Sequence, residues 1–302
     1  MLLCSDVALF ESLIQALYKS KGISPTYIEK DYYTALVLKR IMAISPTLVF
    51  KGGTSLSKCH HIIERFSEDI DISSNDPNLN RTTRRMCLHG IEDELQKLSI
   101  NLINPDDIRS GRLFNRFECR YPSVVDADSA GEMIIEFASQ SVSFPNEIKP
   151  IQSFIGEYLT EMGRQDLVSK YELEPFEVKT QSLVRTFVDK VYAICDYHIS
   201  KQLRRQSRHI YDLHHLMAKV NLDDSLISLF KEIYQLRVDN PACHSAKTGM
   251  RLSVLLNESI EKKTYYADYQ TQTLPLLYDQ TPYDECVKAV KQIADFLEKN
   301  GL

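Results

Sequence analysis

Two carboxylates separated by one residue, Asp69 and Asp71, are the residues best suited to chemistry in this chain. Residues 68–73 read EDIDIS, so acidic and β-branched residues alternate. On a β-strand this alternation places both aspartates on one face, with Ile70 and Ile72 on the other. Mg²⁺ prefers oxygen ligands and keeps substrate phosphates in its remaining positions. The spacing therefore predicts that Asp69 and Asp71 hold Mg²⁺, or Mn²⁺ in its place.

A glycine turn precedes these acids, in the segment KGGTSLSK at residues 51–58. It follows a short apolar run at residues 47–50, and its two glycines permit a tight turn. The next residues favour the start of a helix running toward residue 64, whose amino end would attract phosphate. Walker-type ATP binding is set aside because the G-K-[ST] ending is missing. The candidate nucleotide-binding residues are Gly52, Gly53, Thr54, Ser55 and Lys58.

The turn, helix and paired aspartates together resemble the polymerase-β-like nucleotidyltransferase superfamily. The segment KGGTSLSK, followed by the segment RFSEDIDIS, resembles the AbiEii/AbiGii-type branch of this superfamily. This branch is the toxin half of type IV toxin-antitoxin systems. The separation between the two motifs is wider than the compact superfamily pattern, but it is similar to this branch. Further similar segments are IEKDYYTALVL at 28–38, FVDKVYAI at 187–194 and RHIYDLHHL at 208–216, with a fainter likeness at 268–269.

The resemblance implies an α+β fold: a polymerase-β-like nucleotidyltransferase domain with a small mixed sheet at 1–150, then a helical domain at 151–302 that completes the cleft. It implies transfer of a nucleoside monophosphate from an NTP to an RNA hydroxyl, with the tRNA 3′ end favoured, to arrest growth or limit phage. A cognate antitoxin is a candidate partner. The alternatives are an NTP-dependent phosphotransferase acting on a protein or small molecule, and a non-catalytic binding module.

Composition and hydrophobic pattern outline the elements. Helical periodicity covers about 4–20, 26–44 and 81–98, strands are expected at 113–121 and 132–139, and the chain beyond 150 reads as almost wholly helical. The net charge of −5 excludes a generally basic nucleic-acid binder. Seven scattered cysteines favour reduced thiols, and no apolar run reaches membrane-spanning length. We therefore expect a cytoplasmic enzyme without a membrane partner.

Glu136 lies in the strand candidate MIIEFA, which is otherwise apolar on both faces. A carboxylate in a strand covered on both faces is costly unless it is paired or binds metal. The resemblance places this strand beside Asp69 and Asp71, where Glu136 would complete the metal site or act as a base. The alternative is a strand-end glutamate in a salt bridge.

Lys190 falls inside the apolar arc of a helix expected at about 180–196, so it should face the buried side. A phosphate ligand is one interpretation, and a snorkelling stem is the other. Asp212 lies about 100° from the apolar stripe of its helix, where an ordinary surface acid would lie. Its catalytic role comes from the resemblance, which places it near the lysine. His209 stands where this branch often has another acid.

Basic clusters are the candidates for contact with RNA phosphates, although a solvated basic surface is the alternative. One cluster is Arg204, Arg205 and Arg208, and the others are Arg81, Arg84 and Arg85, and Arg109, Arg112, Arg116 and Arg120. Ser67 is a candidate regulatory site. Its phosphorylation would add negative charge two residues before Asp69 and should inhibit.

Overall fold

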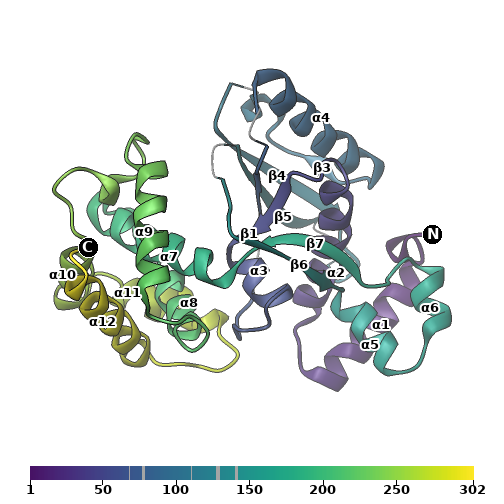
Figure 1. Ribbon diagram of the computed structural model, residues 1–302. Helices are drawn as coiled ribbons and strands as arrows, with labels where there is room; N and C mark the ends of the chain where they lie inside the picture. Colours follow the sequence, from purple (N-terminus) through teal and green to yellow (C-terminus); the bar gives the residue numbers. More distant parts are fainter. Residues whose placement is uncertain (68, 77–78, 110, 127–129, 140–141) are drawn as a thin grey trace. The chain divides into compact units, whose positions relative to one another are not determined.

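A computed structural model describes residues 1–67, 69–76, 79–109, 111–126, 130–139 and 142–302 (Figure 1). The chain divides into two compact units. The first comprises Met1–Cys59 and Ser67–Gln181, and the second comprises His60–Phe66 and Ser182–Leu302. This division lies later than the boundary expected near residue 150. The segment His60–Phe66, which lies between the glycine turn and the paired aspartates in the sequence, belongs to the second unit.

The described strands of the first unit form a seven-stranded mixed sheet in the order β3-β4-β5-β2-β1-β7-β6. The β2–β5 and β1–β7 pairs are parallel, and the other neighbours are antiparallel. The strand that bears the paired aspartates, β2, therefore lies in the middle of the sheet. The strands are β1 (Leu48–Lys51), β2 (Asp69–Ser74), β3 (Asn101–Leu102), β4 (Phe114–Pro122), β5 (Ala130–Ala138), β6 (Asn146–Ile151) and β7 (Phe176–Gln181).

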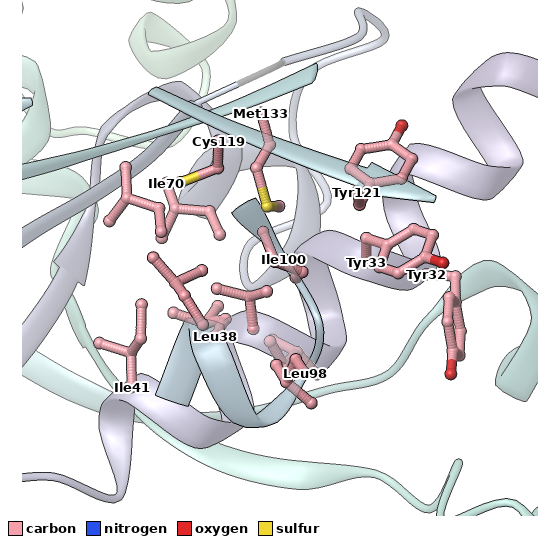
Figure 2. Packing of buried hydrophobic residues seen from close by; sticks show 14 of the residues in the cluster. Tyr32, Tyr33, Leu38, Ile41, Ile70, Leu98, Ile100, Cys119, Tyr121 and Met133 are labelled. Carbon is pink, nitrogen blue, oxygen red and sulfur yellow. The ribbon is translucent and has the colours of Figure 1, made fainter. Parts of the chain in front are cut away.

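Helices of the first unit cover one face of this sheet with apolar side chains. In Figure 2, Tyr33 and Leu38 lie with Ile70, Cys119 and Met133 of the sheet in one buried cluster. Because only this face is sealed by apolar packing, alternate residues of β2 and β5 keep partial exposure on the other. The helices are α1 (Val7–Lys21), α2 (Pro25–Met42), α3 (Gly52–Lys58), α4 (Arg81–Lys97), α5 (Phe154–Glu161) and α6 (Gln165–Lys170), with short turns η1 (Leu3–Ser5) and η2 (Pro105–Asp107).

The second unit is helical in its described elements. Buried residues such as Phe187, Leu213, Leu256 and Ile293 form its interior. No described helix of the chain combines the length and apolar character needed to cross a membrane. The elements are α7 (Leu183–Ser200), α8 (Arg208–Met217), α9 (Asp224–Arg237), η3 (His244–Ala246), α10 (Leu252–Glu261), α11 (Tyr266–Asp268), η4 (Tyr269–Thr273), η5 (Leu274–Leu276) and α12 (Tyr283–Lys299).

The expected mixed fold with a helical C-terminal region is confirmed, and most element positions agree with the sequence pattern. Helices expected at 4–20, 26–44 and 81–98 correspond to α1, α2 and α4, and the two expected strands correspond to β4 and β5. The described chain beyond residue 150 is largely helical as expected, with β7 as the exception. Residues 176–181 form β7, which pairs with β1 and β6 and keeps this stretch in the first unit's sheet.

The helix expected to run toward residue 64 ends at Lys58 instead. Residues 60–66 form no helix, because backbone groups of this segment pair with a later part of the second unit. Phe66 N donates to Leu276 O at 3.3 Å, and Tyr278 N donates to Glu64 O at 2.7 Å. The wide spacing between the glycine turn and the aspartates therefore accommodates a segment that packs in the second unit.

Candidate active site

The paired aspartates lie on β2 as predicted. Ile70 and Ile72 are fully buried, whereas Asp69 and Asp71 keep partial exposure on the opposite face. In the parallel β2–β5 pair, Asp71 is opposite Glu136. Side chains opposite each other on neighbouring strands share a face. The sheet therefore gathers three carboxylates on its more open side.

Glu136 lies beside the aspartates, but the argument from a doubly covered strand was wrong. Its side chain is 24% exposed, because apolar packing seals only the other face of β5. Burial, followed by the negative charges of Asp71 and Asp69, raises the pKa of Glu136 to about 7. Arg116 Nη1 lies 3.1 Å from Glu136 Oε1, so the salt bridge considered as an alternative is present.

The glycine turn is built against one of these carboxylates. Gly52 has φ +75°, and a Cβ at this position would lie 1.8 Å from Asp71 Oδ2. Thr54 Oγ1 donates to the Asp69 carbonyl oxygen, and Ser55 Oγ donates to Gly52 O at 2.9 Å. Only glycine therefore fits at position 52. The buried hydroxyl of Ser55 binds within the turn, and the buried hydroxyl of Thr54 binds the backbone of β2. A nucleotide-binding role for these residues and Gly53 stays a prediction.

Lys58 ends α3 and is buried. Its Nζ lies 2.6 Å from Asp31 Oδ1 and 4.3 Å from the centroid of the Phe154 ring. The other oxygen, Asp31 Oδ2, accepts a hydrogen bond from Phe154 N at 2.6 Å. Lys58 therefore links α3 to α2 and α5, and its predicted nucleotide contact remains untested. Sequence reasoning missed Asp31, although an acid within the family-like segment 28–38 was a signal.

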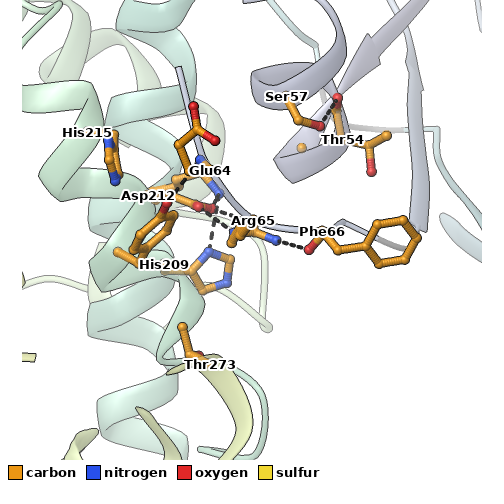
Figure 3. Close-up of polar contacts among 12 residues, drawn as sticks. Thr54, Ser57, Glu64, Arg65, Phe66, His209, Asp212, His215 and Thr273 are labelled. Atoms are coloured by element: carbon orange, nitrogen blue, oxygen red, sulfur yellow. Dashed lines mark hydrogen bonds and ion pairs between the residues drawn. The ribbon is translucent and has the colours of Figure 1, made fainter. Parts of the chain in front are cut away.

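The second unit contains a buried ionic cluster centred on Asp212 (Figure 3). Arg65 Nε donates to Asp212 Oδ1 at 2.7 Å, and Arg65 Nη2 donates to Asp212 Oδ2 at 2.8 Å. Lys190 Nζ lies 2.6 Å from Asp212 Oδ2. The expectation that Lys190 faces inward is confirmed. The surface position inferred for Asp212 from the helical stripe was wrong, because Arg65 from segment 60–66 covers it.

Two cations share this one carboxylate. Burial acts to raise the pKa of Asp212, but Arg65 and Lys190 outweigh it and hold that pKa well below its ordinary value. Burial lowers the pKa of Lys190, an effect that Asp212 opposes and Arg65 reinforces. Arg65, Lys190 and Asp212 together therefore leave a positive charge, which favours an anionic ligand.

His209 borders this cluster. Its Nδ1 lies 3.5 Å from Lys190 Nζ, and its ring stacks on Tyr197 with centroids 5.8 Å apart. Burial, reinforced by Lys190 and Arg208, holds the pKa of His209 well below its ordinary value. His209 therefore adds no negative charge, and the cluster stays positive.

The remaining predicted residues lie in the loop before α8, at the first residue of α8 and directly after segment 60–66. Arg204 is exposed and Arg205 and Arg208 are half-buried, which leaves their RNA contacts a prediction. Asp268, in the fainter family-like segment, accepts hydrogen bonds from Arg205 N and Ser207 N and so shapes this loop. Ser67 is half-buried, and its regulatory role is likewise untested. Arg65 was missed, although it stands in the quoted segment RFSEDIDIS.

The carboxylate face fits a hard cation. Within the described ranges, no group of three or more His, Cys, Asp or Glu side chains could hold a metal ion by itself. Asp71 lies opposite Glu136, however, and the pKa of Glu136 is raised first by burial and then by the negative charges of Asp71 and Asp69. Two aspartates supply oxygen donors, and Mg²⁺ commonly takes its other ligands from water and substrate phosphates. Asp69 and Asp71 are therefore suited to Mg²⁺ that arrives with a nucleotide.

Comparisons with known proteins show the fold and the family of the chain. The solved structure of MenT4, a nucleotidyltransferase toxin from Mycobacterium tuberculosis, has a similar fold, with a TM-score of 0.58 over 94% of this chain and 89% of that chain, at 14% identity. No curated protein matches. The chain is a nucleotidyltransferase. A family model described as the nucleotidyl transferase AbiEii toxin of type IV toxin-antitoxin systems matches residues 37–295, and the chain belongs to that family.

Proposed function

We propose that this enzyme transfers a nucleoside monophosphate from an NTP to a hydroxyl of RNA, with the tRNA 3′ end as acceptor, to arrest growth or limit phage. The observation that carries the proposal is the row of carboxylates on β2 and β5, with Gly52 packed against Asp71. The family suggests a cognate antitoxin as the partner that counters this activity.

The first unit would bind the triphosphate and the attacking group. Asp69 and Asp71 would hold Mg²⁺, which supplies positive charge to the phosphates. The backbone amides of the turn at Gly52 and Gly53, where α3 begins, would hold the triphosphate. Glu136, next to Asp71, would accept the proton of the RNA hydroxyl or complete the carboxylate set. The hydroxyl oxygen attacks the α-phosphorus as the bond to pyrophosphate breaks.

Lys190 would supply positive charge to the phosphates. Lys190 is held by Asp212, which also binds Arg65, so the ammonium group is fixed before substrate arrives. A preorganised cation stabilises charge that develops on the phosphates without reorganising during the reaction. In this proposal Lys190 contacts phosphate, while Asp212 and Arg65 hold it in place.

An NTP-dependent phosphotransferase could use the same acids, and the position of the label separates the two reactions. Total RNA is incubated with Mg²⁺ and with each NTP labelled at its α- or γ-phosphate. We expect α-label in RNA and none from γ-label. Asp69→Asn should lower labelling at least about 100-fold, whereas the exposed control Asp106→Asn should not. Transfer of γ-label to protein, or full activity of Asp69→Asn, would overturn the proposal.

A further inference from the structure

A cavity of about 440 Å³ lies between α4 and the segment that follows η2 in the first unit. Arg81, Arg85 and His89 line it from one side, and Arg109 lines it from the other. The helical residues recur every four positions, so they share one face of α4. All four side chains belong to exposed residues. The fold thus brings together parts of two arginine clusters that are more than 20 positions apart in the sequence.

The charge of this cavity is positive in a chain whose net charge is −5. Among the described residues that line it, Glu92 is the one carboxylate, against three guanidinium groups. Among the described residues, no carboxylate lies within salt-bridge distance of Arg81, Arg85 or Arg109. Arg109 Nε instead donates to the Asp106 carbonyl oxygen at 3.4 Å. Most guanidinium N–H groups in the cavity therefore remain available to a ligand.

The helix terminus itself does not supply the binding groups. Asn80 caps α4, and its Oδ1 accepts hydrogen bonds from Thr82 N at 2.8 Å and Thr83 N at 3.1 Å. Thr83 Oγ1 in turn accepts a hydrogen bond from Asn80 N at 2.9 Å. Because these amides are already satisfied, recognition of an anion would come from the arginine side chains. Planar guanidinium groups suit the paired oxygens of a phosphodiester.

We propose that this arginine cavity binds backbone phosphates of the RNA acceptor. The inference rests on the proposed function for the identity of the acceptor. RNA is favoured over a free phosphate because several separated guanidinium groups fit successive phosphates of a chain. An enzyme with excess negative charge also needs concentrated positive charge to hold RNA.

The test is binding of refolded total tRNA, measured by fluorescence anisotropy at several salt concentrations without NTP. The triple variant Arg81→Gln, Arg85→Gln, Arg109→Gln should bind about tenfold or more weakly at 0.1 M salt, with a shallower dependence on salt. The matched control is Lys21→Gln, Lys97→Gln, Arg164→Gln. It removes three exposed cations, each paired with an acid of the same unit. Equal thermal midpoints would show that both triples are folded.

The outcomes separate this inference from the proposed function. If wild type transfers nucleotide to RNA but the two triples bind tRNA equally, the cavity assignment fails and the proposed function stands. If tRNA binding depends on the three arginines but no α-label reaches RNA, the proposed function fails and the cavity assignment stands. Loss of NTP affinity with tRNA affinity unchanged would assign the cavity to a free nucleotide. Absence of tRNA binding by wild type would also overturn the inference.

Discussion

Arg65 holds Asp212 through two hydrogen bonds, from Nε to Oδ1 at 2.7 Å and from Nη2 to Oδ2 at 2.8 Å. The two residues are 147 positions apart in the sequence. Arg65 stands in the stretch that separates the glycine turn from the paired aspartates, whereas Asp212 is on α8. The segment His60–Phe66 is thereby fastened into the second unit. The Asp212 carboxylate, which binds Arg65, also forms an ion pair with Lys190.

Replacing Arg65 by alanine should destabilise the second unit. The change leaves Asp212 buried with Lys190 as its one remaining partner in this cluster, and breaking a buried pair costs about 3 kcal/mol or more. Chemical denaturation should show this decrease in the free energy of unfolding. Arg164→Ala is the control, because it breaks an exposed pair with Asp166 and should cost below about 1 kcal/mol. Equal stability of the two variants would show that the buried pair contributes nothing.

The Lys190→Met variant should lose transfer activity but keep its stability. Asp212 keeps both hydrogen bonds to Arg65, and a buried ammonium is replaced by an apolar chain of similar length. We expect the unfolding free energy to stay within about 1 kcal/mol of wild type. Transfer of α-labelled nucleotide should fall about 100-fold or more. A Lys190→Met variant that is as unstable as Arg65→Ala would instead make Lys190 a structural residue.

The sequence predicted the strand of the paired aspartates well because its signal is local. Alternation in EDIDIS determines which side chains share a face, and that pattern does not depend on distant contacts. Asp212 shows the limit of such reasoning. The helical stripe of α8 placed it at the surface, but burial there is decided by Arg65, a residue from a distant part of the chain. The short strand β7 was missed for the same reason, since its pairing with β1 and β6 is a long-range contact.

Gly52→Ala should impair the enzyme more than the same change at Gly22. Both glycines have positive φ, +75° and +72°, so alanine is strained at each by about 1–2 kcal/mol. Only at Gly52 would the added Cβ also meet Asp71, since nothing lies within 4 Å at Gly22. Gly22→Ala should therefore keep its transfer activity, while Gly52→Ala should lose about 100-fold. Equal activities would show that the approach of the turn to Asp71 does not matter.

Mg²⁺ should stabilise the first unit through Asp69 and Asp71. Without metal, Asp71→Asn should be as stable as wild type or more so, because it removes a negative charge beside Glu136. At Mg²⁺ concentrations of about 100 times its Kd, wild type should gain about 2.7 kcal/mol. Thermal unfolding with Mg²⁺ and with EDTA measures this gain, which Asp71→Asn should lose and Asp106→Asn should keep. A gain retained by Asp71→Asn would place the cation elsewhere.

His209 should make the stability of the second unit fall in mild acid. Burial is the largest cause of its lowered pKa. The charged groups that also act on it are Lys190, Arg208, Asp212 and Arg65. Because the folded pKa lies below the unfolded one, the unfolded chain binds more protons as pH falls below about 6.5. Stability is therefore lost as pH falls toward the folded pKa, by at most about 1.4 kcal/mol per pH unit from this one group.

His209→Gln cannot titrate, so its unfolding free energy should depend less on pH between 6.5 and 5 than that of wild type. Some dependence should remain, because the pKa values of His198 and His215 are also lowered, chiefly by burial. His244→Gln is the control, since His244 is exposed on η3 of the same unit. Denaturant titrations at a series of pH values measure the difference. A slope unchanged by His209→Gln would mean that this histidine binds its proton equally well in the folded and unfolded chain.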